Sequence, residues 1–313
     1  MRSPLSRRSV APTFIIAAPR SGTTWLQKAL NAHPAVYCTE HRLFGPHMDL
    51  VRDGDAPSPR LRITLDQYVK SSLQSATLDN LAISAEDFEW ELVQTLAKTV
   101  VAQSLRASGK SIHVDKITPY PGTAHHVIAC IQAIWPEAKV ILLLRDGRDV
   151  LTSGVYHWSK KAVVDPTDTD LMTPEQPTNG GFFTDTQITE WAELWRDVEQ
   201  ATHGVDPQHL LTVRYEDMLT NQPQELKRIL QYLGANASSA TLKGCVTESS
   251  FEAMSGGRQQ GEAEQGAHVR KGISGDWKQH FTREVAKRFD AIAGDLLVKL
   301  GYETDRSWVD TTG

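Results

Sequence analysis

A short loop between an apolar run and a helical pattern is the first part of the chain equipped for chemistry. Residues 14–18 are all apolar, and Leu26, Ala29 and Leu30 lie at helical spacing. A strand, loop and helix in this order leave several backbone N–H groups unpaired at the helix start, where the helix dipole also favours an anion. The polar and small residues of this loop are therefore candidate phosphate ligands: Arg20, Ser21, Gly22, Thr23 and Thr24.

The loop at residues 19–25 departs from the G-x-x-x-x-G-K-S/T pattern that binds nucleoside triphosphates. An alanine stands where that pattern has its first glycine, and Thr23 stands where it has its lysine. We therefore expect a phosphate-binding loop that does not hold the β- and γ-phosphates of ATP around magnesium. A P-loop nucleotide kinase is one alternative, and an ordinary strand-to-helix turn is another.

A second candidate pair of anion ligands follows the most apolar run of the chain, residues 140–144. Arg145 ends that run, and a charge at the end of a buried strand is costly unless it meets an opposite charge. Ser153 comes eight residues later, about two turns into the helix that we expect to follow. Arg145 and Ser153 can hold an anion together, or Arg145 can pair with Asp146 or Asp149 within the protein.

A third candidate segment, residues 270–278, reads R-K-G-I-S-G-D-W-K. Two cations beside a glycine allow the backbone to approach a phosphate closely. Residues 255–267 before it are rich in glycine and glutamine, so we expect residues 255–275 to form a mobile lid over a bound ligand. The alternative is a basic pair on a solvated loop.

These segments, taken in order, resemble the sulfotransferases that use 3′-phosphoadenosine 5′-phosphosulfate (PAPS). The resemblance rests on P-R-S-G-T-T-W at residues 19–25, on Arg145 with Ser153, and on R-K-G-x-x-G-D-W-K at residues 270–278. It implies in-line transfer of a sulfonyl group from PAPS to a hydroxyl or amine of a small-molecule, glycan or lipid acceptor, releasing 3′,5′-diphosphoadenosine. The alternative from another class is a nucleotide-binding module that has lost catalysis.

The resemblance also implies which residues bind the nucleotide. The loop at residues 19–25 would hold the 5′-phosphosulfate, and the two other segments would hold the 3′-phosphate. Trp25 and the phenylalanine of an S-F-x-x-M segment would face the adenine, while Tyr215 belongs to a matching Y-E-D-M segment. The implied set is Arg20, Ser21, Gly22, Thr23, Thr24, Trp25, Arg145, Ser153, Tyr215, Phe251, Arg270, Lys271 and Gly272.

The general base is where the family patterns diverge. Cytosolic members carry it in K-T-H-L-P, but here Lys116 is followed by Thr118 in place of the histidine. Carbohydrate and tyrosylprotein members share P-R-S-G-T-T, a later H-P, and then a catalytic glutamate, which would be Glu40. We expect Glu40 to be the base, with His41 and His113 as alternatives, while Arg20 and Lys116 stabilise charge on the leaving phosphate. A structural pair between Glu40 and the adjacent Arg42 is the competing interpretation.

The elements that must position these residues alternate between strands and helices. Strands are expected at 14–18, 36–38, 111–115, 139–145 and 210–215, with helices at about 85–105, 122–135, 223–233 and 282–300. This order predicts an α/β fold with a single doubly wound, mostly parallel sheet, helices on both faces and a P-loop NTPase-like architecture. Ligands bind beyond the carboxyl ends of such strands. That edge should gather Arg20, Glu40, Lys116, Arg145 and Tyr215.

The organisation of the chain is expected to be simple. We interpret residues 1–313 as a single sulfotransferase domain, with residues 1–12 disordered. Two polar, proline-rich or glycine-rich stretches, 41–80 and 160–185, should be loops that line the acceptor pocket.

Composition bounds the remaining properties. The 313 residues are 40% hydrophobic, and the net charge of −5 argues against a nucleic-acid partner or an anionic membrane. No apolar stretch is long enough to span a bilayer. Three widely spaced cysteines and the lack of a C-x-x-C motif suggest neither a disulfide framework nor a metal site, so a cytoplasmic protein is expected. The oligomeric state is open.

Overall fold

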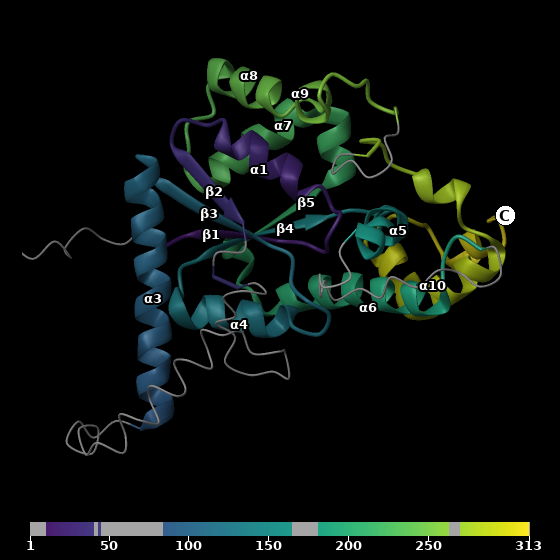
Figure 1. Ribbon diagram of the computed structural model, residues 1–313, viewed down its shortest axis with the longest axis horizontal. Coiled ribbons are helices and arrows are strands. Elements are labelled where there is room, and N and C mark those ends of the chain that lie inside the picture. Colours follow the sequence, from purple (N-terminus) through teal and green to yellow (C-terminus); the bar gives the residue numbers. More distant parts are fainter. Residues whose placement is uncertain (1–10, 41–42, 45–83, 165–180, 263–269, 313) are drawn as a thin grey trace, which may run out of the picture.

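The computed structural model describes residues 11–40, 43–44, 84–164, 181–262 and 270–312. Their centre is a five-stranded sheet in the order β2-β3-β1-β4-β5, and every pair of neighbouring strands is parallel. The strands are β1 (Thr13–Ile16), β2 (Val36–Glu40), β3 (Ile112–Ile117), β4 (Lys139–Leu144) and β5 (Leu210–Arg214). The expected parallel, doubly wound sheet is therefore confirmed (Figure 1).

The sheet is buried on both faces, which explains why its strands read as continuous apolar runs. Side chains alternate across β1, so that Phe14 and Ile16 join one core cluster while Ile15 and Ala17 join the other. All four are completely buried. The two cores hold the sheet from opposite sides and fix the edge at which its strands end.

Helices cover both faces, as predicted (Figure 1). Five helices contribute buried residues to the core with Phe14: α3 (Ala85–Ser108), α4 (Ala124–Ile134), α5 (Gly147–Val164), α6 (Asp185–Ala201) and α10 (Arg283–Lys299). The other core is covered by α1 (Thr23–Asn31), α7 (Tyr215–Leu233) and α8 (Ser239–Glu248), and the short α9 (Phe251–Ser255) packs beside α8.

Local capping chemistry sets several helix boundaries. The Ser84 hydroxyl accepts a hydrogen bond from the Asp87 amide at the start of α3, and Gly109 ends that helix with a φ of 66°. A capping box formed by Thr184 and Gln187 starts α6. The boundaries of α3 lie within a few residues of the predicted ones, 85 and 105.

Other boundaries differ from the sequence-based expectation. Tyr215 is the first residue of α7 and not the last of a strand, because β5 ends at Arg214. Helix α7 starts eight residues before the predicted position 223, and non-helical dihedrals at Asn221 (φ −147°, ψ 68°) kink it there. Strand β3 continues to Ile117, so Lys116 lies within it. Helices α8 and α9 were not predicted, since their short sequences carry little apolar periodicity.

The predicted loops are only partly described. Helix α5 continues to Val164, so the first residues of the stretch 160–185 are helical. Residues 165–180 lie outside the described residues, as do 41–42 and 45–80 of the first loop. The expected disorder of residues 1–12 falls almost entirely on residues 1–10, which also lie outside them. Within the described chain, no helix combines the length and apolar character needed to cross a membrane.

Candidate active site

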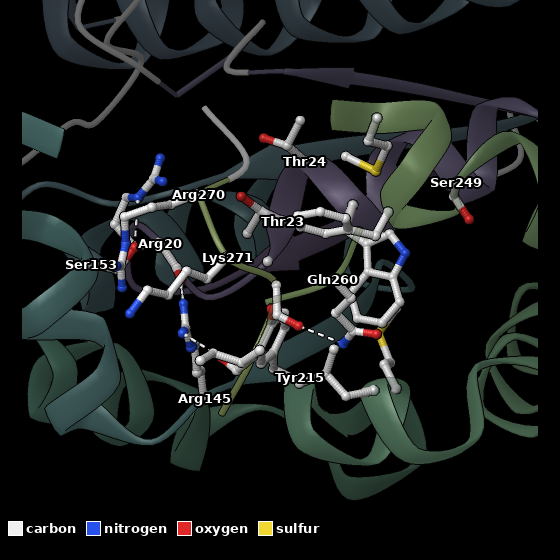
Figure 2. A pocket seen from close by; sticks show the side chains of 18 of the residues that line it. Arg20, Thr23, Thr24, Arg145, Ser153, Tyr215, Ser249, Gln260, Arg270 and Lys271 are labelled. Atoms are coloured by element: carbon white, nitrogen blue, oxygen red, sulfur yellow. Dashed lines mark hydrogen bonds between the residues drawn. The ribbon is translucent and has the colours of Figure 1, made fainter. Parts of the chain in front are cut away.

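A cavity of about 370 Å³ lies at the carboxyl edge of the sheet. Cationic side chains gather toward one side of it and Ser249 lies on the opposite side (Figure 2). Most of the predicted site residues line this one cavity: Arg20, Gly22, Thr23, Thr24, Trp25, Glu40, Lys116, Arg145, Ser153, Tyr215, Phe251, Arg270, Lys271 and Gly272. Residues more than 250 positions apart in sequence thus meet at the edge where a doubly wound sheet binds ligands.

The loop after β1 has an unusual backbone. Arg20 has a φ of 68° and is the only non-glycine residue with a positive φ in the described part of the chain. Gly22 has a φ of 91°, and a β-carbon there would lie 2.5 Å from the Tyr215 ring. Helix α1 starts at Thr23 without a side-chain cap. The loop therefore needs glycine at position 22, and it presents an uncapped helix N-terminus to the cavity.

Two side chains of this loop, Ser21 and Arg20, differ in their exposure to the cavity. Ser21 is 1% exposed, does not line the cavity, and its Oγ has no hydrogen-bond partner within the described chain. Arg20 donates from Nε to Ser153 Oγ at 3.3 Å, which links the loop to α5. Burial, with the charges of Arg145 and Arg270, lowers the pKa of Arg20 to about 10. A cation under such repulsion is well suited to receive an anion.

Arg145 connects the first two candidate segments. Its Nη1 donates to the Arg20 carbonyl at 2.8 Å and its Nη2 donates to the Ile273 carbonyl at 3.2 Å. The guanidinium lies 4.6 Å from the centre of the Tyr215 ring, and its buried Nε has no partner in the described structure. Arg145 Nη2 also lies 3.9 Å from Asp149 Oδ2. Arg145 therefore forms the ion pair within the protein and lines the cavity as well.

Asp149 holds the third segment against α5. Its carboxylate accepts hydrogen bonds from the amides of Gly275 (2.7 Å) and Trp277 (3.0 Å). Burial raises the pKa of Asp149, although Arg145 and these two amides act in the opposite direction. Sequence reasoning considered Asp149 only as a partner for Arg145. The sequence did contain a signal for such a role, because Asp149 lies in the first turn of the helix that follows a buried strand.

The two cations of the third segment share one carboxylate. Asp276 is 2% exposed, forms an ion pair with Arg270 and binds Lys271 Nζ at 2.6 Å. Burial acts to raise the pKa of Asp276, but the hydrogen bonds from Lys271 and Arg270 outweigh it and lower this pKa. The Arg270 guanidinium also lies 4.3 Å from the centre of the Tyr156 ring. Of the predicted lid, residues 255–262 and 270–275 are described, and residues 263–269 lie outside the described residues.

The other end of the cavity is aromatic and apolar. Trp25 and Tyr215 meet edge to face with ring centroids 5.6 Å apart. Gly272 has a φ of 65°, and a β-carbon there would collide with the Phe251 ring. Sequence reasoning did not single out several residues that line this region: Met218, Leu219, Gln222, Ser249 and Met254. A flat, weakly polar ligand group fits between such walls.

Glu40 and Lys116 are register partners at the ends of β2 and β3. They form an ion pair in which the Lys116 side chain is 3% exposed and the Glu40 side chain is 49% exposed. Thr118, which stands in place of the family histidine, lines the cavity too. Arg42, the partner in the competing interpretation, lies outside the described residues.

The histidine alternatives fare differently. His113 is 3% exposed and does not line the cavity, and burial lowers its pKa to about 4. His41 lies outside the described residues. His157, which was not singled out from the sequence, lines the cavity one helical turn after Ser153. In the described portion of the chain, no group of three or more His, Cys, Asp or Glu side chains could hold a metal ion.

Comparison with known proteins identifies relatives over most of the chain. The model of the sulfotransferase domain family matches residues 11–301. Mouse sulfotransferase 2A6 is 29% identical over 204 residues, which are 61% of this chain and 68% of the mouse protein. Rat sulfotransferase 2B1 is 31% identical over 184 residues, 56% of this chain and 52% of the rat protein. The matched part spans between about half and two thirds of these relatives.

Solved structures share the fold. The crystal structure of mouse sulfotransferase SULT7A1 complexed with PAP (3′,5′-diphosphoadenosine) has a TM-score of 0.54 at 15% identity, covering 93% of this chain and 84% of that chain. A sulfotransferase domain from the curacin biosynthetic pathway has a TM-score of 0.53 at 16% identity, covering 92% of this chain and 98% of that one. At such identities the likeness establishes the architecture.

Proposed function

This chain belongs to the PAPS-dependent sulfotransferase family, and we propose that it transfers a sulfonyl group from PAPS to an acceptor, leaving PAP. The observation that carries the proposal is the convergence of the three candidate phosphate-binding segments and the Glu40–Lys116 pair on one cavity. The acceptor is a hydroxyl or amine of a small molecule, glycan or lipid. The expected acceptor loops, 41–80 and 160–185, lie mostly outside the described residues.

The polar groups around the cavity fit an adenine nucleotide that carries anionic groups at both its 3′ and 5′ positions. Buried donors of the cavity-lining residues with no partner in the described structure include Arg145 Nε and Arg270 Nε, and such groups are costly to leave unsatisfied. We propose that the loop at residues 19–25 holds the 5′-phosphosulfate, and that Arg145, Ser153, Arg270 and Lys271 hold the 3′-phosphate. Trp25 and Phe251 would flank the base.

The proposed chemistry is in-line displacement at sulfur, with the phosphate of the nucleotide as the leaving group. Catalysis of such transfers is mainly positioning and charge stabilisation. The α1 amides, Arg20 and Lys116 neutralise charge that grows on the leaving phosphate. Glu40 accepts the proton of the acceptor, and Lys116 holds the Glu40 carboxylate at the cavity. PAPS supplies the activated sulfonyl group, and the scheme needs no metal ion.

Labelled PAPS, offered with a panel of phenol, steroid, sugar and lipid-alcohol acceptors, tests the activity. Transfer of label to at least one acceptor class is expected. Tight binding of PAP without transfer to any acceptor would favour the nucleotide-binding module that has lost catalysis.

The substitution Glu40→Gln tests the proposed base. It removes a proton acceptor while keeping the size of the side chain, so turnover should fall by about 10²–10⁴ while the affinity for PAP stays near that of the wild type. Glu193→Gln is a matched control, because Glu193 is exposed on α6 and does not line the cavity. Near-normal turnover of the Glu40 variant would remove Glu40 from its role.

A cytoplasmic location is also proposed. It rests on the cysteines, which occur as three buried free thiols: Cys38, Cys130 and Cys245.

A further inference from the structure

One polar side chain stands at the apolar end of the cavity and belongs to none of the three phosphate-binding segments. Gln222 lies in α7 between the kink residue Asn221 and Pro223. A proline inside a helix removes a backbone hydrogen bond and favours such a kink. The Gln222 side chain lines the cavity together with Trp25 and Phe251, the aromatic residues assigned above to the base.

Two hydrogen bonds fix the orientation of the Gln222 amide. Ser249, which is completely buried, donates its hydroxyl proton to the Cys245 carbonyl at 2.7 Å. The Ser249 oxygen can then only accept, and it accepts from Gln222 Nε2 at 2.7 Å. Reversing the amide would place Gln222 Oε1 against an oxygen that has no proton left to give. The nitrogen of the amide is therefore held toward Ser249.

The rest of the amide is available to a ligand. One Nε2–H and the Oε1 acceptor of Gln222 have no partner among the described residues. A donor beside an acceptor matches adenine, which offers its amino group next to a ring nitrogen on both of its polar edges. Glutamine makes this bidentate pair with adenine in protein–nucleic acid complexes.

Guanine lacks that match when the amide is held in this orientation and the base keeps the pose that adenine takes, with the sugar and both phosphates in the same places. Its N7 edge presents two acceptors, N7 and O6, so Oε1 would face another oxygen. Its N1 edge offers an acceptor and a donor in the reverse order, which would require the reversed amide that Ser249 and Cys245 disfavour. We propose that Gln222 reads the nucleobase and makes this site select adenine over guanine, an inference that rests on the proposed nucleotide-binding function.

The test compares two nucleotides that differ only in the base: PAP and guanosine 3′,5′-bisphosphate. Their affinities are measured by calorimetry for the full chain and for Gln222→Met, which keeps the length of the side chain but removes both amide groups. The preference of the wild type for PAP should fall in the variant by about 5- to 150-fold, the value of one bidentate amide–base pair. Both ligands carry the same phosphates, so a general loss of folding or charge would weaken both alike.

A second variant tests the orienting hydrogen bond. Ser249→Ala leaves the Gln222 amide free to reverse, so the ratio of the affinity for PAP to the affinity for guanosine 3′,5′-bisphosphate should fall. Gln231→Met is the matched control, because Gln231 is exposed on the same helix and does not line the cavity.

The outcomes distinguish a failure of the Gln222 assignment from a failure of the proposed function. A wild-type preference for PAP that survives unchanged in Gln222→Met overturns the role of Gln222 alone. A wild-type chain that binds neither bisphosphate overturns the proposed function, and the base assignment with it.

Discussion

The two proposed anion-binding regions of the cavity are built in different ways. The first, the loop at residues 19–25, is shaped by the backbone. Its charge comes from the uncapped start of α1 and from Arg20, and its form depends on positive φ values at Arg20 and Gly22. The second, residues 270–277, is shaped by side chains. Its two cations meet at Asp276, and Asp149 holds two of its amides.

The difference follows from the cost of gathering like charges. Backbone amides carry partial charges that secondary structure aligns, so the anion-binding capacity of the first region depends mainly on its backbone geometry. Two full cations in one segment repel each other, and a shared carboxylate offsets that repulsion in the absence of ligand. The first region should therefore fail when its backbone geometry is changed, and the second when its carboxylate balance is changed.

The largest effect is expected at Gly22. Gly22→Ala places a β-carbon 2.5 Å from the Tyr215 ring at a backbone φ of 91°. The loop must therefore shift, and its amide N–H groups would no longer point at the bound phosphate. Strain of this kind costs about 1–3 kcal/mol, and misplacing one such donor typically lowers the rate by about 10²–10³. Steady-state kinetics with PAPS and calorimetry with PAP measure the loss.

The control for this change is Gly244→Ala. Gly244 lies in α8, has no positive φ, and a β-carbon there would meet nothing within 4 Å. Alanine is the better helix former, so this variant should bind PAP normally and gain up to about 1 kcal/mol of stability. If Gly22→Ala also binds PAP normally, nucleotide binding by the first region does not depend on its backbone geometry.

A smaller effect, which nucleotide binding should reverse, is expected at Asp276. Asp276→Asn removes the charge shared by Arg270 and Lys271, and the ligand-free protein should lose about 1–3 kcal/mol of stability. The 3′-phosphate would supply the missing negative charge. The rise in melting temperature on adding saturating PAP should therefore be larger in the variant than in the wild type.

Equal PAP-induced shifts of the melting temperature in the wild type and in Asp276→Asn would show that the Asp276 carboxylate does not take the place of the phosphate. Glu193→Gln, which removes an exposed charge outside the cavity, again serves as the control. Comparing Asp276→Asn with Gly22→Ala distinguishes the two regions. Only Asp276→Asn should regain stability when the nucleotide binds.

The same contrast explains what could be predicted from sequence. The first region is local: an apolar strand, a glycine and a helix start follow one another within residues 14–26, so short-range patterns reveal it. The buried strands were predictable for the same reason. The topology then places Glu40 beside Lys116, because adjacent parallel strands end at one edge.

The second region depends on contacts between distant residues. Asp149 binds amides 126 and 128 positions away, and no local pattern encodes such a pairing. Gln222 precedes Pro223, which signals a break in the helix, but its partner Ser249 is 27 positions distant and no local pattern links the two. The placement of Tyr215 at the start of α7 was missed because an aromatic residue suits the end of a strand equally well.

The smallest effect, and the sharpest contrast between the regions, is expected in their response to acid. Because the pKa of Asp276 is lowered in the folded protein, its bonds to Arg270 and Lys271 contribute stability above the unfolded value near 3.8. That contribution is lost as the pH falls below this value toward the folded pKa. Hydrogen exchange, corrected for intrinsic rates, should show residues 270–277 losing protection in this range while residues 19–25 keep theirs. Because Asp276→Asn has no such carboxyl to titrate, its exchange at residues 270–277 should lack the acid step, and an acid step that persists in the variant would assign it to Asp149 or His280 instead.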